Sequence, residues 1–130
     1  MILRFQDASG VVPFDEWLET FRRRGKTQNL DAARKLAAAV TRLAAEGHAL
    51  RRPTSAPLRD GLYELRVEIR HVNYRALYFF AGAGVAVLVH GCTKEGEVAK
   101  ADLDRAVARR LAYEADPRLH TAPAPQVPHS

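Results

Sequence analysis

The side chains of this sequence that could do chemistry are mostly cationic. Arg66 lies in a segment that alternates polar and apolar residues, Arg75 is the one charge in an apolar segment, and His90 ends a third segment. An arginine guanidinium binds two phosphate oxygens at once and stays charged, and a histidine of ordinary pKa, about 6.5, exchanges protons near neutrality. These residue types favour binding or chemistry at a phosphate group.

Each of these side chains also has a non-catalytic interpretation. Arg75 could pair with Glu64 or Glu68 on a neighbouring strand, because ion pairs across strands are common. Arg66 could be a solvated strand arginine, and a histidine that ends a buried strand, such as His90, is often structural. The sequence leaves both interpretations open.

The composition argues against a metal or a disulfide. Cys92 is the single cysteine of the 130 residues, so no disulfide forms within the chain. Carboxylates, histidines and cysteines do not cluster at ligand spacing, so we expect no metal and no cofactor.

The net charge predicts a polyanionic partner. The chain has 20 Lys and Arg against 15 Asp and Glu, a formal charge of +5. Such a surface attracts nucleic acid or an acidic protein. The candidates for binding RNA phosphates are Arg22, Arg23, Arg24, Lys26, Arg51, Arg52 and Arg59. The first four could equally be a solvated helix end, where the helix dipole favours cations.

The positioning elements follow from periodicity. A short strand is predicted over residues 1–5, a helix from Pro13 to about Gly25, and a second helix from a cap at Asn29 to Gly47. Residues 48–60, with two prolines and three arginines, predict an irregular connector. Three strands are expected at about 63–69, 72–80 and 85–90, with hairpin turns near His71 and over 81–84.

A loop over residues 91–97 and a last helix carrying Leu103, Val107 and Leu111 complete the prediction. This order indicates an α+β domain, a mainly antiparallel sheet with two N-terminal helices and one C-terminal helix. We expect the helices to cover one face and to leave the other free for a ligand. The domain should span residues 1–116, followed by a disordered tail over 117–130 that is rich in proline. The apolar runs are too short to cross a membrane, so we expect a cytoplasmic protein.

Three motifs carry a resemblance to a known family. Residues 58–66 (LRDGLYELR), 74–80 (YRALYFF) and 90–94 (HGCTK) occur in that order. Together they resemble the RelE/HigB-like toxins of type II toxin–antitoxin pairs, the group that includes the phage-derived Gp49-like proteins. The resemblance covers roughly residues 1 to 114 and implies a small RelE-like α+β fold.

The resemblance also implies a function. Such proteins are ribosome-dependent mRNA endonucleases that use no metal, inhibit translation, and are silenced by a cognate antitoxin, often a helix-turn-helix protein. It places Arg75, Arg66, Lys94 and His90 at the site, and the partners would be mRNA, the ribosome and the antitoxin. Residues 97–101 (EVAKA) lack the tyrosine that some relatives use as general base, and Glu64 stands where some carry lysine. The general base stays unassigned, and a ParE-like gyrase inhibitor or an inactive phage-derived accessory protein remains an alternative.

Overall fold

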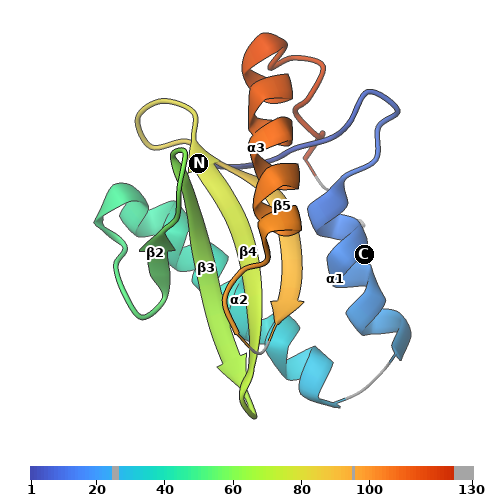
Figure 1. Ribbon diagram of the computed structural model, residues 1–130, viewed down its shortest axis with the longest axis vertical. Coiled ribbons are helices and arrows are strands. Elements are labelled where there is room, and N and C mark those ends of the chain that lie inside the picture. The colour runs from blue at the N-terminus through green and yellow to red at the C-terminus, as the bar shows by residue number, and fades with distance from the viewer. Residues whose placement is uncertain (25–26, 95, 125–130) are drawn as a thin grey trace, which may run out of the picture.

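The computed structural model describes residues 1–24, 27–94 and 96–124, except for the side chains of 22, 24, 27, 28 and 94. Its elements are β1 (Ile2–Arg4), α1 (Pro13–Arg24), α2 (Thr27–Glu46), the short 3₁₀ helix η1 (Gly47–Ala49), β2 (Ser55–Pro57), β3 (Leu62–Ile69), β4 (Val72–Phe80), β5 (Ala86–Lys94) and α3 (Lys100–Ala115). The strands form one sheet in the order β1-β5-β4-β3-β2, in which only β1 and β5 pair in parallel. The predicted α+β fold is confirmed (Figure 1).

One face of the sheet is buried by α1 and α2. The alternating residues Tyr63, Leu65, Val67 and Ile69 of β3 point to this side, as the period of two predicts. Trp17 of α1 lies directly over Gly91 of β5, where an added Cβ would come within 2.1 Å of the indole ring. A glycine at this position therefore lets α1 pack closely against the sheet.

The opposite face is not free, contrary to the prediction. α3 crosses it in front of the sheet in the view of Figure 1, and a second core of buried residues, including Leu77, Phe79 and Val89, forms beneath it. Helix α3 packs on this face because Leu77 and Phe79 of β4 point toward it, and burying large apolar side chains is favourable. The predicted helical stripe is also partly wrong, since Leu111 is 62% exposed while Ala106 and Tyr113 are buried.

Three element boundaries differ from the prediction. The connector contains a short strand, β2, which tolerates Pro57 because it is an edge strand. The predicted loop after His90 is strand up to Lys94, and a register shift at Leu77/Tyr78 accommodates its continuation. Asn29 does not cap α2, which begins at Thr27; its side-chain oxygen accepts a hydrogen bond from the Tyr74 hydroxyl at 3.2 Å.

The hairpin turns are confirmed. Arg70 and His71 join β3 to β4 in a two-residue turn, and both have positive φ, as the tightest hairpins require. At the other end, the Ala81 N–H donates to the Val85 carbonyl and closes the turn between β4 and β5. None of the helices in the described ranges is long and apolar enough to span a membrane.

The prediction of a disordered tail is wrong for residues 117–124. Thr121 forms an antiparallel bridge with Phe5, and backbone hydrogen bonds join Gln6 to His120 at 3.0 Å and Ala122 to Arg4 at 2.8 Å. The His120 ring stacks on Phe5 with 5.1 Å between centroids, and Ala122 is buried. The segment docks because β1 is an edge strand with unpaired backbone groups. Residues 125–130 lie outside the described part.

Candidate functional site

Three neighbouring rows of the sheet carry most of the candidate residues, on the face toward α3. Residues that pair across antiparallel strands point to the same face. The rows, read from β3 through β4 to β5, are Glu64–Leu77–His90, Arg66–Arg75–Cys92 and Glu68–Asn73–Lys94. The hydrogen-bond register of the sheet therefore brings Arg66, Arg75 and His90 together, and it places the Lys94 backbone beside them; the side chain of Lys94 lies outside the described part.

Arg75 is buried in an ion pair. Its Nε lies 3.0 Å from Oε2 of Glu64, its Nη1 donates to the Gly96 carbonyl at 2.6 Å, and the two residues are only 4% and 6% exposed. The Nε and Oε2 atoms are close without the geometry of a hydrogen bond, so Coulomb attraction holds them. Of the two interpretations of Arg75, pairing with Glu64 is the one seen here, and the guanidinium is covered by the segment before α3.

Arg66 lines an open polar groove next to this buried pair. The groove is bounded by Pro53, Thr54, Arg66, Glu68 and Asn73 and has a volume of about 360 Å³. We call it the Arg66 groove. The Thr54 carbonyl accepts a hydrogen bond from the Arg66 backbone N–H at 2.9 Å, which fixes the connector as one wall. Among the described side chains no carboxylate lies within 4.0 Å of the Arg66 guanidinium, so its charge is available to a ligand.

His90 is buried between β5 and α3 with both ring nitrogens occupied. Nε2 lies 2.7 Å from Oδ1 of Asp102, and Nδ1 lies 2.7 Å from Nη1 of Arg109, which also donates to the Val89 carbonyl at 2.9 Å. Arginine has only donors, so Nδ1 accepts and Nε2 carries the proton that it donates to Asp102. Burial lowers the pKa of His90 below its ordinary value of 6.5, although the hydrogen bond to Asp102 opposes this. His90 thus fastens α3 to the sheet and does not line the Arg66 groove.

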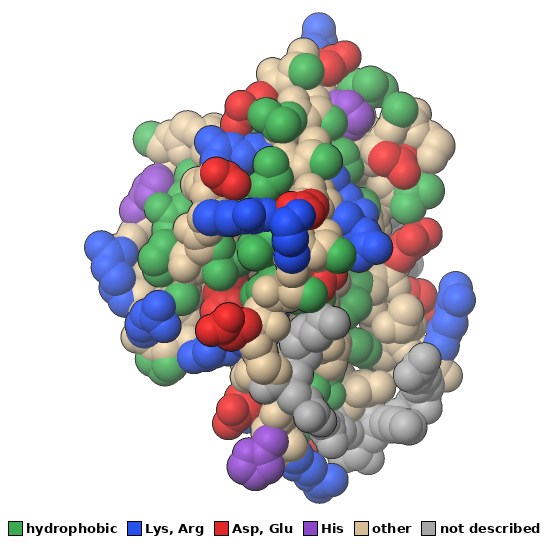
Figure 2. Space-filling view, viewed as in Figure 1, with side chains coloured by type: hydrophobic (Ala, Val, Ile, Leu, Met, Phe, Trp, Pro, Cys, Tyr) green, Lys and Arg blue, Asp and Glu red, His purple; other side chains and the backbone are tan. Residues whose placement is uncertain are grey.

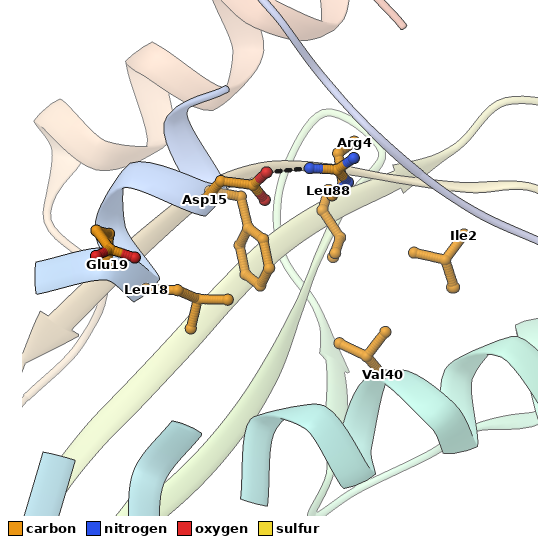
Figure 3. Close-up of a pocket in the computed structure, with 8 residues that line it drawn as sticks. Ile2, Arg4, Asp15, Leu18, Glu19, Val40 and Leu88 are labelled. Atoms are coloured by element: carbon orange, nitrogen blue, oxygen red, sulfur yellow. Dashed lines mark hydrogen bonds and ion pairs between the residues drawn. The ribbon is translucent and has the colours of Figure 1, made fainter. Parts of the chain in front are cut away.

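Another cavity lies on the far face, between β1, α1 and α2. It has a volume of about 460 Å³ and an apolar lining that includes Ile2, Leu18 and Val40, with the Arg4–Asp15 ion pair at its rim (Figure 3). Because its one lining arginine is already paired, this cavity lacks a free cation for phosphate.

The sequence profile of the phage-derived protein Gp49-like family (DUF891) matches residues 25–111, about two thirds of the chain. The chain belongs to this family. The matched region runs from α2 into α3 and includes all three polar rows of the sheet. Gp49-like proteins are a toxin-like family of the RelE type, which agrees with the resemblance carried by the three motifs. No curated protein matches the chain significantly.

In this Gp49-like protein the basic residues predicted to bind RNA do not lie together on one surface. Arg59 is held by two carboxylates, Asp60 at 3.7 Å and Asp104 at 2.7 Å, and so ties the chain before β3 to α3. Arg51 and Arg52 are exposed near β2, and Arg23 is exposed on the last turn of α1. The side chains of Arg22 and Arg24, and all of Lys26, lie outside the described residues.

The fold also assembles a group that could hold a metal, which the sequence spacing did not suggest. Ligand atoms of His90, Cys92 and Asp102 lie within 4.8 Å of one another, and all three residues are buried. In the present tautomer, however, His90 Nε2 carries a proton and Nδ1 faces Arg109, so no histidine lone pair is free for an ion. Metal binding here would require Arg109 to move away from the ring.

Sequence reasoning missed Asp102, Arg109, Glu68 and Asn73. The spacing of Asp102, Arg105 and Arg109, three and four residues apart, places them on one side of a helix, and this was the available signal for the first two. The sequence signal for Glu68 and Asn73 was weaker. They lie at equal distances before and after the predicted hairpin turn, so a symmetric hairpin would pair them across it. Only the strand register shows that they line a groove with Arg66.

Proposed function

We propose that this Gp49-like protein is the toxin of a type II toxin–antitoxin pair and that it inhibits translation by cleaving mRNA without a metal. The observation that carries the proposal is Arg66, which has no carboxylate partner among the described side chains and lies in an open groove of a protein from a toxin-like family. An RNA-cleaving toxin needs little more than a positioned 2′-hydroxyl and a cation at the phosphate.

The reaction balances without a co-reactant. The 2′-oxygen forms a bond to the adjacent phosphorus as its proton leaves, and the bond from phosphorus to the 5′-oxygen breaks. That oxygen takes up a proton, and the products are a 2′,3′-cyclic phosphate and a 5′-hydroxyl. Negative charge grows on the phosphoryl oxygens, where the planar guanidinium of Arg66 would bind two of them.

Glu68 is the group that we assign to accept the 2′-proton. It is exposed, and it lines the Arg66 groove beside the arginine. Asn73, which pairs with Glu68 across the two strands, would orient the ribose through its amide. The buried Arg75–Glu64 pair would act as a positioning element, since Arg75 also holds the Gly96 carbonyl in the segment before α3.

The partners that this proposal requires are mRNA in the ribosome and a cognate antitoxin. A formal charge of +5 supports attraction to ribosomal RNA, although this attraction is independent of sequence. A helix-turn-helix antitoxin would keep the toxin inactive until it is degraded.

One observation favours a second candidate, a ParE-like gyrase inhibitor. Arg75, the arginine of the family's Tyr-Arg motif, is neutralised by Glu64 and covered. A protein that acts by binding gyrase would need no exposed arginine at that position, whereas a nuclease must rely on Arg66 instead.

The test is induction of the chain in cells, with mapping of RNA 5′-ends and a DNA-supercoiling assay in the same samples. Arg66→Ala is the informative variant, and Arg34→Ala, a solvent-exposed arginine on α2, removes the same charge elsewhere. New RNA ends that disappear with Arg66→Ala and persist with Arg34→Ala support the nuclease. Altered supercoiling without new RNA ends refutes it and supports the gyrase inhibitor.

A further inference from the structure

A groove at the other side of the connector combines aromatic rings with arginines that have no carboxylate partner among the described residues. It has a volume of about 520 Å³, and its lining includes His48, Arg51, Arg52, Ser55, Ala56 and Tyr63. We call it the His48 groove. It lies on the α2 side of the sheet edge, because Tyr63 points to the face that α2 covers.

The aromatic rings of the His48 groove are held rigidly. His48 stacks on Phe80 with 3.6 Å between centroids and 27° between planes. Tyr63 stacks with Tyr78 at 5.5 Å and meets the edge of Phe80 at 5.3 Å. The hydroxyls of Tyr78 and Ser55 lie 2.6 Å apart, which ties β2 to the same cluster. Preformed rings bind a flat ligand without the entropy cost of ordering them.

Several arginines of the described residues are neutralised by carboxylates, but those of this groove are not. Arg42, Arg59 and Arg110 each lie within 3.0 Å of a carboxylate oxygen. Arg51 and Arg52 have no carboxylate within 4.0 Å among the described residues, and Arg51 donates only to backbone carbonyls, His48 and Leu50. Lys and Arg side chains also gather along the left edge of Figure 2, where Figure 1 shows the β2 side of the sheet.

Aromatic rings and unpaired cations together match a single-stranded nucleic acid. Bases of a single strand expose faces that stack on aromatic side chains, while their phosphates need cations; a duplex hides those faces. The connector separates this groove from the Arg66 groove, since Pro53 and Thr54 line one and Arg52 and Ser55 line the other. The two grooves thus lie on opposite sides of the connector, the Arg66 groove toward α3 and the His48 groove toward α2.

We propose that the His48 groove binds a nucleotide of single-stranded RNA, on the other side of the connector from the Arg66 groove. A base stacks against His48 and Tyr63, and Arg51 and Arg52 bind its phosphates. This assignment rests on the proposed RNA-cleaving function, and it names a subsite for that substrate.

The experiment measures binding without cleavage. A fluorescent six-nucleotide single-stranded RNA, with 2′-O-methyl at every position so that it cannot be cut, is titrated with the full chain over a range of salt concentrations. Arg52→Ala should weaken binding and reduce the salt slope by about 0.7, the value for one lost phosphate contact. His48→Ala should weaken binding at least about fivefold with an unchanged slope, as expected for lost base stacking.

Matched controls isolate the groove. Arg34→Ala lowers the net charge as Arg52→Ala does, but its side chain is 80% exposed on α2 and outside the groove lining, so it should bind nearly as the parent does. His48→Leu keeps an apolar side chain on Phe80 and serves if His48→Ala fails to fold. The parent should bind an RNA with one abasic position less well than the intact RNA. The His48 variants should bind the two RNAs equally well.

The proposal is overturned if Arg52→Ala behaves like Arg34→Ala, if the His48 variants bind as the parent does, or if duplex RNA binds equally. An acidic peptide of the same charge that displaces the RNA with equal affinity also overturns it. These outcomes are separate from failure of the proposed function, in which the parent binds the RNA but neither cuts natural RNA nor arrests growth.

Discussion

The Nε atom of Arg75 lies 3.0 Å from Oε2 of Glu64, on the strand beside it, and both side chains are buried. The arginine that the family motif singles out is thus part of a charge pair inside the fold. A buried charge that loses its partner keeps the full cost of desolvation. The pair therefore ties the stability of the domain to the same rows of the sheet that form the candidate site.

Arg75→Ala should destabilise the protein by roughly 3 to 5 kcal/mol, because it leaves the Glu64 carboxylate buried without a cation. Denaturant unfolding measures the change, and the double variant Glu64→Leu/Arg75→Met should recover much of the loss. If Arg75→Ala unfolds at the parental midpoint but no longer arrests growth, the arginine acts in the chemistry and the structural interpretation fails.

Arg66→Ala should lower RNA cleavage about a hundredfold, since one lost electrostatic donor typically costs that much in the transition state. The melting temperature should stay near that of the parent, because Arg66 is partly exposed in an open groove. Arg66→Lys should also be impaired, as lysine keeps the charge without the planar fork. A lysine variant with parental cleavage would argue against two-point phosphate binding.

Stability should decrease as the pH falls below about 6.5. Burial lowers the pKa of His90 in the folded state below its ordinary value of 6.5, so in the range between the two values the unfolded chain binds more protons. The loss is at most about 1.4 kcal/mol per pH unit. Denaturant unfolding between pH 7.5 and 5 measures this slope. His90→Gln should flatten it, and His71→Gln, at an exposed turn, should leave it unchanged.

A chain that ends at Asp116 should melt at a lower temperature than the parent. It lacks the bridge from Thr121 to Phe5, the stacking of His120 on Phe5 and the buried Ala122. A chain that ends at Ala124 keeps all three contacts and is the control. Equal melting temperatures for the two truncations would show that residues 117–124 add nothing to stability.

RNA cleavage should survive a metal chelator. The donor atoms of His90, Cys92 and Asp102 are close together, but Arg109 occupies the second ring nitrogen of the histidine. Zinc added to the purified chain should accordingly leave its melting temperature unchanged. Cleavage that stops in chelator and returns with zinc, together with a rise in melting temperature, would show that the three residues form a metal site.

The sequence by itself determined the α+β class, both hairpin turns and the buried face of β3. These features depend on local patterns: apolar residues at a period of two on β3, apolar residues at helical spacing on α1 and α2, and turn residues between the strands. The family motifs on β3, β4 and β5 could also be recognised from the sequence, because each is a continuous run of residues.

Only the tertiary structure decided which of these residues can meet a ligand. Exposure depends on elements far away in the sequence. The segment at Gly96 covers Arg75, Asp102 and Arg109 contact both ring nitrogens of His90, and Thr121 pairs with Phe5 at the edge of the sheet. Local patterns fix the face to which a side chain points, but not what packs on that face. Arg66 and Arg75 are directly opposite in register, yet the fold leaves one in an open groove and buries the other.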